Sequence, residues 1–238
     1  MNRSPAPASR LPIIAIDGPS GVGKSTLSKL LARELGFINL DTGAMYRAVA
    51  LAASRRGVNP DDVEALGCLA RSVVIDFVRS AAGERVLLDG EDVSAAIRTP
   101  EISLLTSKVS ACPDVREALV RRQRELCARG GFVLEGRDIG TVVFPDAEIK
   151  FFLVASAEER GRRRFLELQA GGAPVDLART IADVEARDSA DRQRDHSPLR
   201  QADDARLIDT SSLGIEQVLG EMLKVVRDQQ ASVGSGQV

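Results

Sequence analysis

A glycine-rich segment near the start of the chain carries the residue types that bind a nucleotide phosphate. Residues 18–25 read GPSGVGKS and match the pattern G-x-x-x-x-G-K-[ST] at every defined position. Glycines allow backbone N–H groups to surround a phosphate, and a helix that begins there adds partial positive charge. Lys24 can reach the β- and γ-phosphates, and the Ser25 hydroxyl can ligate Mg²⁺. The segment therefore predicts a nucleotide-binding P-loop.

Other parts of the chain indicate which kind of P-loop protein this is. A GTPase would read its base with Asn-Lys-x-Asp, but none of the three asparagines precedes a lysine. A helicase or transporter ATPase usually has an apolar strand that ends in a pair of acids. Here the strand at 132–135 ends in Glu135 and continues as Gly136-Arg137-Asp138. The length of the chain suits a small kinase, for which we expect ATP and Mg²⁺.

Arginines follow the predicted strands and recur on later helices. A kinase for a phosphorylated acceptor needs cations for both phosphates and a lid that excludes water. Thr42 and Arg47 follow the second strand and Arg137 follows the third, at the edge where ligands bind in open parallel sheets. Two sets share a helix face by spacing: Arg160, Arg163 and Arg164, and then Arg187, Asp191 and Arg194. Each of these features also has an ordinary interpretation. The two helix faces could be surface ion pairs, Arg137 and Asp138 could form a turn, and Thr42 could cap a helix.

The hydrophobic pattern places these residues on alternating strands and helices. It predicts strands at 11–16, 37–40, 132–134, 149–154 and 206–209, and helices at 26–35, 43–56, 114–129, 157–169, 177–194 and 215–228. Between 58 and 106 the pattern changes to short β-like pieces at 73–78 and 85–88, which predict a hairpin-bearing insertion. The order of elements is typical of an α/β protein built around a mainly parallel sheet.

The composition excludes several function classes. The 238 residues are 44% hydrophobic and 28% charged, with a net charge of −2. No apolar run approaches about 18 residues, and the first ten residues lack the apolar core of a secretory signal. One histidine, His196, and three scattered cysteines argue against a zinc enzyme or a Ser-His-Asp hydrolase, and we expect reduced thiols. Near-neutral charge and scarce aromatics argue against a stable nucleic-acid partner.

Five motifs, taken in order, resemble those of the bacterial cytidylate kinase family. They are IDGPSGVGKS at 16–25, DTGAMYR at 41–47, VREALVRRQR at 115–124, EGRDIGTVVFP at 135–145 and ARDSADRQR at 186–194. The resemblance runs from about Ile13 to the last predicted helix. Any one motif occurs in other small kinases, whereas the ordered set is specific.

The resemblance implies an α/β fold of the P-loop nucleoside monophosphate kinase type. It would have a five-stranded parallel core sheet with helices on both faces, a short lid, and a monophosphate-binding insert with a small antiparallel sheet. The implied core comprises 11–57 and 107–229, with the lid at about 157–170, and the insert comprises 58–106. Residues 1–10 and 230–238 read as flexible tails. We expect a cytoplasmic monomer without a membrane segment.

The resemblance also implies a reaction and its residues: transfer of the γ-phosphoryl group of ATP to CMP or dCMP. ATP would bind Gly18, Pro19, Ser20, Gly21, Val22, Gly23, Lys24, Ser25 and Thr26. The acceptor would bind Thr42, Arg47, Ser107, Arg116, Arg137, Asp138, Arg187, Asp191 and Arg194, with Ser107, Arg116 and Asp138 at the base. Lys24, Arg137, Arg163 and Arg164 would be catalytic, the last two from the lid. Ser25 and Glu135 are the expected Mg²⁺ residues, with Asp17 as the alternative to Glu135.

Two positions differ from some members of the family. Ser25 stands where some members have glycine, and it restores a direct Mg²⁺ ligand. Thr42 stands where some have serine, and it keeps the hydroxyl. Two other functions stay open from the residues alone: a P-loop kinase for another small acceptor, and a non-catalytic ATP-sensing or nucleic-acid-associated protein. The second would use the basic helix face of Arg121, Arg122 and Arg124.

Overall fold

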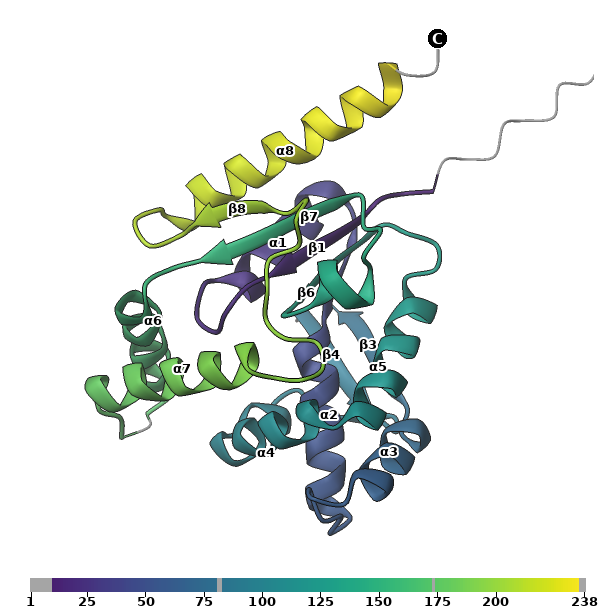
Figure 1. Ribbon diagram of the computed structural model, residues 1–238, viewed down its shortest axis with the longest axis vertical. Helices are drawn as coiled ribbons and strands as arrows, with labels where there is room; N and C mark the ends of the chain where they lie inside the picture. The colour runs from purple at the N-terminus through teal and green to yellow at the C-terminus, as the bar shows by residue number, and fades with distance from the viewer. Residues whose placement is uncertain (1–9, 81–82, 173, 236–238) are drawn as a thin grey trace, which may run out of the picture.

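A five-stranded parallel sheet forms the centre of the molecule, in the order β2-β6-β1-β7-β8 (Figure 1). The computed structural model describes residues 10–80, 83–172 and 174–235. The strands are β1 Ile13–Asp17, β2 Ile38–Asp41, β6 Phe132–Gly136, β7 Ile149–Val154 and β8 Arg206–Asp209. All four neighbouring pairs are parallel, which confirms the predicted core sheet.

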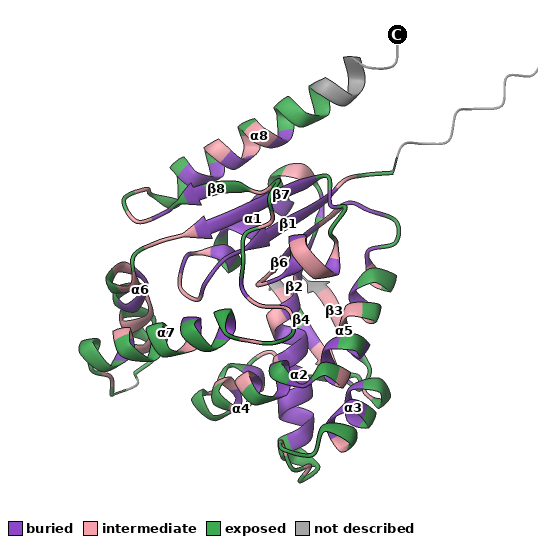
Figure 2. Ribbon diagram, viewed as in Figure 1, coloured by how far each residue is buried: buried purple, intermediate pink, exposed green. Residues whose placement is uncertain are grey.

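Helices cover both faces of this sheet because its central strands are apolar on both sides. Every residue of β1 is buried, as is nearly all of β7 (Figure 2). On one face lie α1 Lys24–Leu35 and α8 Ile215–Ser235, where Leu27, Leu31 and Met222 pack against the sheet. On the other face lie α5 Pro113–Leu126 and a π-helical turn, η2 Ile139–Val143. Because all five strands are parallel, their carboxyl ends lie at one edge of the sheet, and the P-loop follows β1 at that edge.

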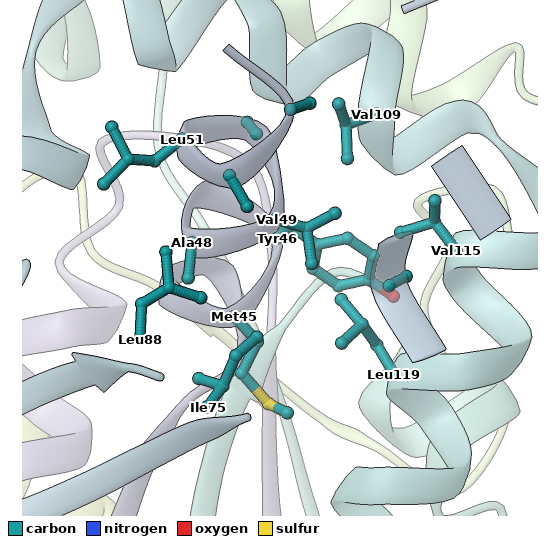
Figure 3. Close-up of a cluster of buried hydrophobic side chains, with 14 of the residues drawn as sticks. Met45, Tyr46, Ala48, Val49, Leu51, Ile75, Leu88, Val109, Val115 and Leu119 are labelled. Atoms are coloured by element: carbon teal, nitrogen blue, oxygen red, sulfur yellow. The ribbon is translucent and has the colours of Figure 1, made fainter. Parts of the chain in front are cut away.

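A second hydrophobic core surrounds α2 Thr42–Arg55, whose residues from Ala44 to Ala53 are almost all buried. Figure 3 shows its side chains packed among Val109, Val115 and Leu119 on one side and the hairpin residues Ile75 and Leu88 on the other. The hairpin belongs to a small antiparallel sheet of β3 Ile75–Ser80, β4 Gly83–Leu88 and β5 Glu91–Asp92. A small antiparallel sheet was predicted in this region, and it is present.

Two helices in this region were not predicted. They are α3 Val63–Ser72 and α4 Pro100–Ala111, which follows a short 3-10 turn, η1 Ala96–Arg98. Both have regular starts: Asp62 caps α3 through Ala65 N–H, and Thr99 caps α4 just before Pro100. An oxygen-bearing cap and a proline at the first position are ordinary start signals. The sequence pattern of residues 58–106 therefore predicted the hairpin but not the two helices on either side of it.

Two helices form a hairpin beside the carboxyl end of β7: α6 Ala157–Ala170 and α7 Leu177–Arg192 (Figure 1). They pack closely because Gly161 faces Ile181, which any larger side chain at 161 would strike. The spacing predicted that Arg194 shares a face of this helix with Arg187 and Asp191. That prediction is wrong for Arg194, because α7 ends at Arg192 and Arg194 lies beyond it.

The C-terminal helix is longer than predicted. α8 continues to Ser235, past the boundary at 229 drawn for the core. Of the predicted C-terminal tail, residues 230–235 belong to α8, and residues 236–238 lie outside the described residues. The predicted N-terminal tail, residues 1–10, lies outside them except for residue 10. All three cysteines are free thiols, as expected, with Cys112 and Cys127 buried. Within the part of the chain that the structure describes, no helix has the length and apolar content needed to cross a bilayer.

Candidate active site

A cleft of about 1050 Å³ opens at the carboxyl edge of the large sheet. Its walls come from the P-loop and α1, from α2 and α4, and from the α6–α7 hairpin. The predicted site residues that line it are Ser20, Gly21, Val22, Gly23, Lys24, Ser25, Thr26, Thr42, Arg47, Arg116, Glu135, Arg137, Asp138, Arg163, Arg164, Arg187, Asp191 and Arg194. The structure thus gathers residues from six separate segments of the sequence around one space.

The P-loop joins β1 to α1, and its glycines are required by its shape. Gly18 has a φ of 147°, and a Cβ there would collide with the carbonyl oxygen of Leu153. Gly18 and Pro19 do not line the cleft but close the loop behind Lys24. The Lys24 ammonium donates to their carbonyl oxygens at 2.8 and 2.6 Å. The lysine is therefore oriented by the loop itself.

Lys24 and Glu135 are buried charged neighbours at the base of the loop. Burial and the nearby Arg137 lower the pKa of Lys24 to about 7. Burial and the nearby Asp41 raise the pKa of Glu135 to about 7, against the opposing effect of Lys24. The Oε1 atom of Glu135 is buried and has no hydrogen-bond partner among the described residues. A carboxylate oxygen without a partner, beside the Ser25 hydroxyl, suits Mg²⁺, which usually takes one or two protein oxygens and keeps several waters.

Asp17, the alternative Mg²⁺ residue, has a different role in the structure. Its two carboxylate oxygens accept hydrogen bonds from the backbone N–H groups of Ile139 and Gly140, at 2.9 and 2.8 Å. Burial raises its pKa to about 6 despite these bonds. Asp17 does not line the cleft. It anchors η2, the turn that follows Arg137 and Asp138, to the end of β1.

The start of α2 contributes a hydroxyl and a guanidinium to the cleft. Thr42 donates to the backbone carbonyl of Glu135 at 2.6 Å, which ties α2 to β6. Asp41 caps α2 by accepting from Ala44 N–H at 2.9 Å, and it also accepts from Arg47 at 2.8 Å. Arg47 is thereby held against the first turn of the helix, where it lines the cleft.

Asp191 joins two arginines from different segments. Its carboxylate accepts from Arg137 at 2.8 Å and also from Arg194. Burial raises the pKa of Asp191, but these two guanidinium groups outweigh it and hold the pKa below its ordinary value. Arg187, one turn earlier on α7, has a pKa lowered to about 10 by burial and by Arg137. This dense group of cations around one carboxylate is suited to binding a phosphate.

In the same cleft, Arg116 and Asp138 form a buried ion pair. The guanidinium lies 5.5 Å from the centroid of the Tyr46 ring and donates to the Ser110 carbonyl at 3.3 Å. Burial raises the pKa of Tyr46 to about 12, so the ring stays neutral. The pair offers a carboxylate acceptor beside a guanidinium donor, in a place where water is largely excluded.

Ser107, the third predicted base-contacting residue, is not among the residues that line the cleft. Its carbonyl accepts from the Ser110 hydroxyl, and it is Ser110 that lines the cleft and accepts from Arg194 at 3.1 Å. Ser103, Thr106 and the exposed Arg98 also line it. Sequence reasoning missed them because η1 and α4 were not predicted. The Thr99-Pro100 start signal would have placed Ser103, Thr106 and Ser110 on one face.

The two predicted lid arginines line the cleft from α6 but differ in their partners. Arg163 donates to the Thr210 carbonyl at 2.6 Å and to Glu159 at 2.8 Å, which ties α6 to the end of β8. The Arg164 side chain is 43% exposed and pairs with Glu167 at 3.1 Å. Arg163 is therefore fixed in position, whereas Arg164 has a weak surface pair that a ligand can replace.

The parallel sheet, the P-loop and the arginine-lined cleft define a P-loop kinase of the nucleoside monophosphate kinase type. A solved gluconokinase from Sinorhizobium meliloti has the same fold, with a TM-score of 0.50, 11% identity and coverage of 95% of this chain and 98% of its own. The family model for cytidylate kinase matches residues 14–228, and the chain belongs to the cytidylate kinase family. A cytidylate kinase of Syntrophotalea carbinolica is 63% identical over 92% of this chain and 93% of its own. One of Geobacter sulfurreducens is 58% identical over 92% of this chain and 94% of its own.

Proposed function

We propose that this protein is a (d)CMP kinase, which transfers the γ-phosphoryl group of ATP to CMP or dCMP and yields ADP with CDP or dCDP. The observation that carries the proposal is a single cleft lined both by the P-loop and by the buried Arg116–Asp138 pair. The name cytidylate kinase, shared by the relatives that match nearly the whole chain, supports the same reaction.

Cytosine fits the Arg116–Asp138 pair by its hydrogen-bonding pattern. Its exocyclic amine donates, and its ring N3 and O2 accept. Asp138 would accept from the amine, and Arg116 would donate to a ring acceptor. Ser107, proposed as the donor to the other ring acceptor, does not line the cleft in this structure, so that contact would require α4 to turn toward the base. Uracil would instead place a carbonyl oxygen against the Asp138 carboxylate, and two buried acceptors facing each other cost binding energy. The pair would thus discriminate against UMP.

The remaining acceptor contacts follow the cations of the cleft. Arg47, Arg137 and Arg194 would hold the monophosphate, with Thr42 nearby, and Arg187 and Asp191 would contact the sugar. An anionic phosphate oxygen of CMP would attack the γ-phosphorus of ATP as the bond to the ADP oxygen breaks. Because that oxygen is already ionised, the reaction needs no strong general base. Lys24, Arg137, Arg163 and Arg164 would stabilise the charge that develops.

Ser25 and Glu135 fit a magnesium ion. The serine hydroxyl would be a direct ligand, and the unpartnered carboxylate oxygen of Glu135 would hold an ion-bound water. When bound, Mg²⁺ neutralises charge on the β- and γ-phosphates. The loop from Gly18 to Thr26 would orient the triphosphate around it, and the α6–α7 hairpin would exclude water from the transfer.

The proposal includes the organisation of the chain. Residues 58–106 would form a monophosphate-binding insert on a core of 11–57 and 107–229, with the lid at about 157–170. The antiparallel sheet within 58–106 supports this division, although the helix at 100–111 crosses its second boundary. The expected working form is a cytoplasmic monomer whose partners are nucleotides.

One assay tests the function. Phosphoryl transfer from ATP, with Mg²⁺, is measured to CMP, dCMP, UMP, AMP and shikimate under the same conditions. We expect CMP and dCMP to be the best acceptors and UMP to be poorer. Activity on AMP or shikimate without activity on CMP would identify a kinase for another small acceptor and overturn the proposal. Salt-dependent RNA binding without turnover of any acceptor would favour a non-catalytic protein.

A further inference from the structure

A buried ion pair between α6 and α7 holds the tip of the P-loop. Asp188 of α7 is 1% exposed and accepts from the guanidinium of Arg160 on α6, which is 4% exposed. Asp188 also accepts from the backbone N–H of Ser20 at 3.3 Å, and Arg160 donates to the carbonyl of Ser20 at 3.1 Å. The backbone N–H and the backbone carbonyl of Ser20 are therefore both bonded to the α6–α7 hairpin.

The P-loop and α6 are also in direct contact at the next residue. Gly21 has a φ of 79°, and a Cβ there would lie 3.1 Å from both the Cβ and the carbonyl oxygen of Arg160. Arg160 is fixed in turn, since its Nε donates to the Ala155 carbonyl at 3.0 Å. The loop tip cannot move far from the α6–α7 hairpin without breaking the two partly buried hydrogen bonds of Ser20.

The same helix reaches the acceptor end of the cleft through Asp191. Asp191 accepts from Arg137, which follows β6, and from Arg194, which follows α7. Asp188 and Asp191 are three positions apart on α7, so they lie within one turn and move as a unit. One turn of α7 therefore bonds to the phosphate-donor loop on one side and to the acceptor arginines on the other.

We propose that Arg160 and Asp188 are positioning residues through which α7 couples the binding of ATP at the P-loop to the placement of Arg137 and Arg194 for the acceptor. The inference rests on the proposed kinase function. A displacement of Ser20 when the loop closes on phosphate carries the Arg160–Asp188 pair with it, because otherwise both hydrogen bonds to Ser20 break. Asp191 then shifts with the helix and takes the two arginines along. By linkage, CMP must tighten ATP binding by the same factor as ATP tightens CMP binding.

The test measures this factor directly. The dissociation constant of a non-hydrolysable ATP analogue with Mg²⁺ is determined by calorimetry, with and without saturating CMP, in the wild type and in Asp188→Asn. In the wild type we expect CMP to tighten the analogue at least fivefold. In Asp188→Asn we expect the ratio to fall to below about twofold, while each nucleotide alone binds within about threefold of the wild type.

A matched control separates coupling from mere stability. Lys150 is a buried cation that pairs with Asp204 at 2.8 Å, and neither residue lines the cleft. Asp204→Asn should lower the melting temperature but keep the wild-type ratio. If Asp188→Asn fails to fold, Arg160→Lys serves instead, because a lysine keeps the charge but cannot reach Asp188, Ser20 and Ala155 together.

The outcomes are distinguishable from those of the proposed function. A wild type that does not phosphorylate CMP contradicts the function itself. A wild type that phosphorylates CMP but shows no coupling contradicts the positioning role alone. An unchanged ratio in a folded Asp188→Asn or Arg160→Lys variant contradicts it as well, and leaves the ion pair with a purely structural role.

Discussion

Arg116 and Asp138 form an ion pair in which each side chain is only 7% exposed. They come from α5 and from the turn after β6, the next element along the chain, and lie 22 positions apart. The ring of Tyr46 and the carbonyl of Ser110 fix the guanidinium from two further elements. The pair is thus rigid before any nucleotide binds, and rigid donors and acceptors discriminate between bases better than mobile ones.

Asp138→Ala tests this pair. We expect kcat/KM for CMP to fall about 100-fold or more, while the KM for ATP changes by less than about threefold, since the Asp138 carboxylate pairs with Arg116 on α5 and not with a P-loop residue. Preference for CMP over UMP should largely disappear. The free energy of unfolding should fall by about 3–5 kcal/mol, because Arg116 is left buried without its partner. Steady-state kinetics with both nucleotides and urea unfolding measure these effects; equal losses for ATP and CMP would mean that Asp138 does not read the base.

Lys24→Ala tests the catalytic role of the P-loop. Loss of a preorganised cation at the transferring phosphoryl group should lower kcat by about 10²- to 10³-fold. The matched control is Lys224→Ala, since Lys224 is exposed on α8 and does not line the cleft. That variant should keep wild-type kinetics. A kcat within tenfold of the wild type in Lys24→Ala would place the stabilising charge on the arginines instead.

Glu135→Gln tests the magnesium residue through pH. The pKa of Glu135 is raised to about 7 by burial and by Asp41, so the carboxylate ionises as pH rises through that value. Because the ionised form holds the metal-bound water, kcat/KM for Mg·ATP in the wild type should rise with pH up to about 7. The variant does not ionise, so it should lose this acidic limb and need several-fold more Mg²⁺ for half-maximal rate. A variant that keeps the limb would exclude Glu135 as its source.

Asp17→Asn tests the buried anchor of η2 through stability. The folded-state pKa of Asp17 is about 6, above its ordinary value of 3.8. A group with a raised pKa stabilises the fold most below its unfolded pKa and loses that contribution as pH rises through the folded value. The free energy of unfolding of the wild type, relative to the variant, should fall by about 2 kcal/mol between pH 4 and pH 6.5. Urea unfolding at several pH values measures it, and a constant difference would show that Asp17 keeps its ordinary pKa.

Local patterns predicted the parts of the site that local sequence determines. The P-loop could be predicted because its glycines and Lys24 act within eight residues, and the parallel sheet because its strands are uniformly apolar. Arg47 and Arg137 line the cleft, as expected for residues that follow strand ends meeting at one edge, whereas Arg160, predicted on the same helix face as Arg163 and Arg164, does not line it.

The missing parts depend on contacts between distant segments. The hydrogen bond from Arg160 to the Ser20 carbonyl spans 140 positions, and no local pattern distinguishes that arginine from its surface neighbours. Asp17 was weighed as a metal residue because it precedes the P-loop, whereas the fold uses its carboxylate to hold amides 122 and 123 positions away. The helix at 100–111 carried its start signal, but the β-like pieces before it obscured that signal.

The pairing of the strands has a consequence for how the protein is made. β1 and β2 are consecutive in the chain, yet they do not pair with each other; both pair with β6, on its two sides. During synthesis from the N-terminus, neither strand has a neighbour in the sheet until residues 132–136 have been added, and the anchor from Asp17 to η2 forms only after that. More than half of the chain is therefore synthesised before β1 or β2 can pair in the sheet. A truncated product that ends before β6 would expose the edges of both strands and be prone to aggregate.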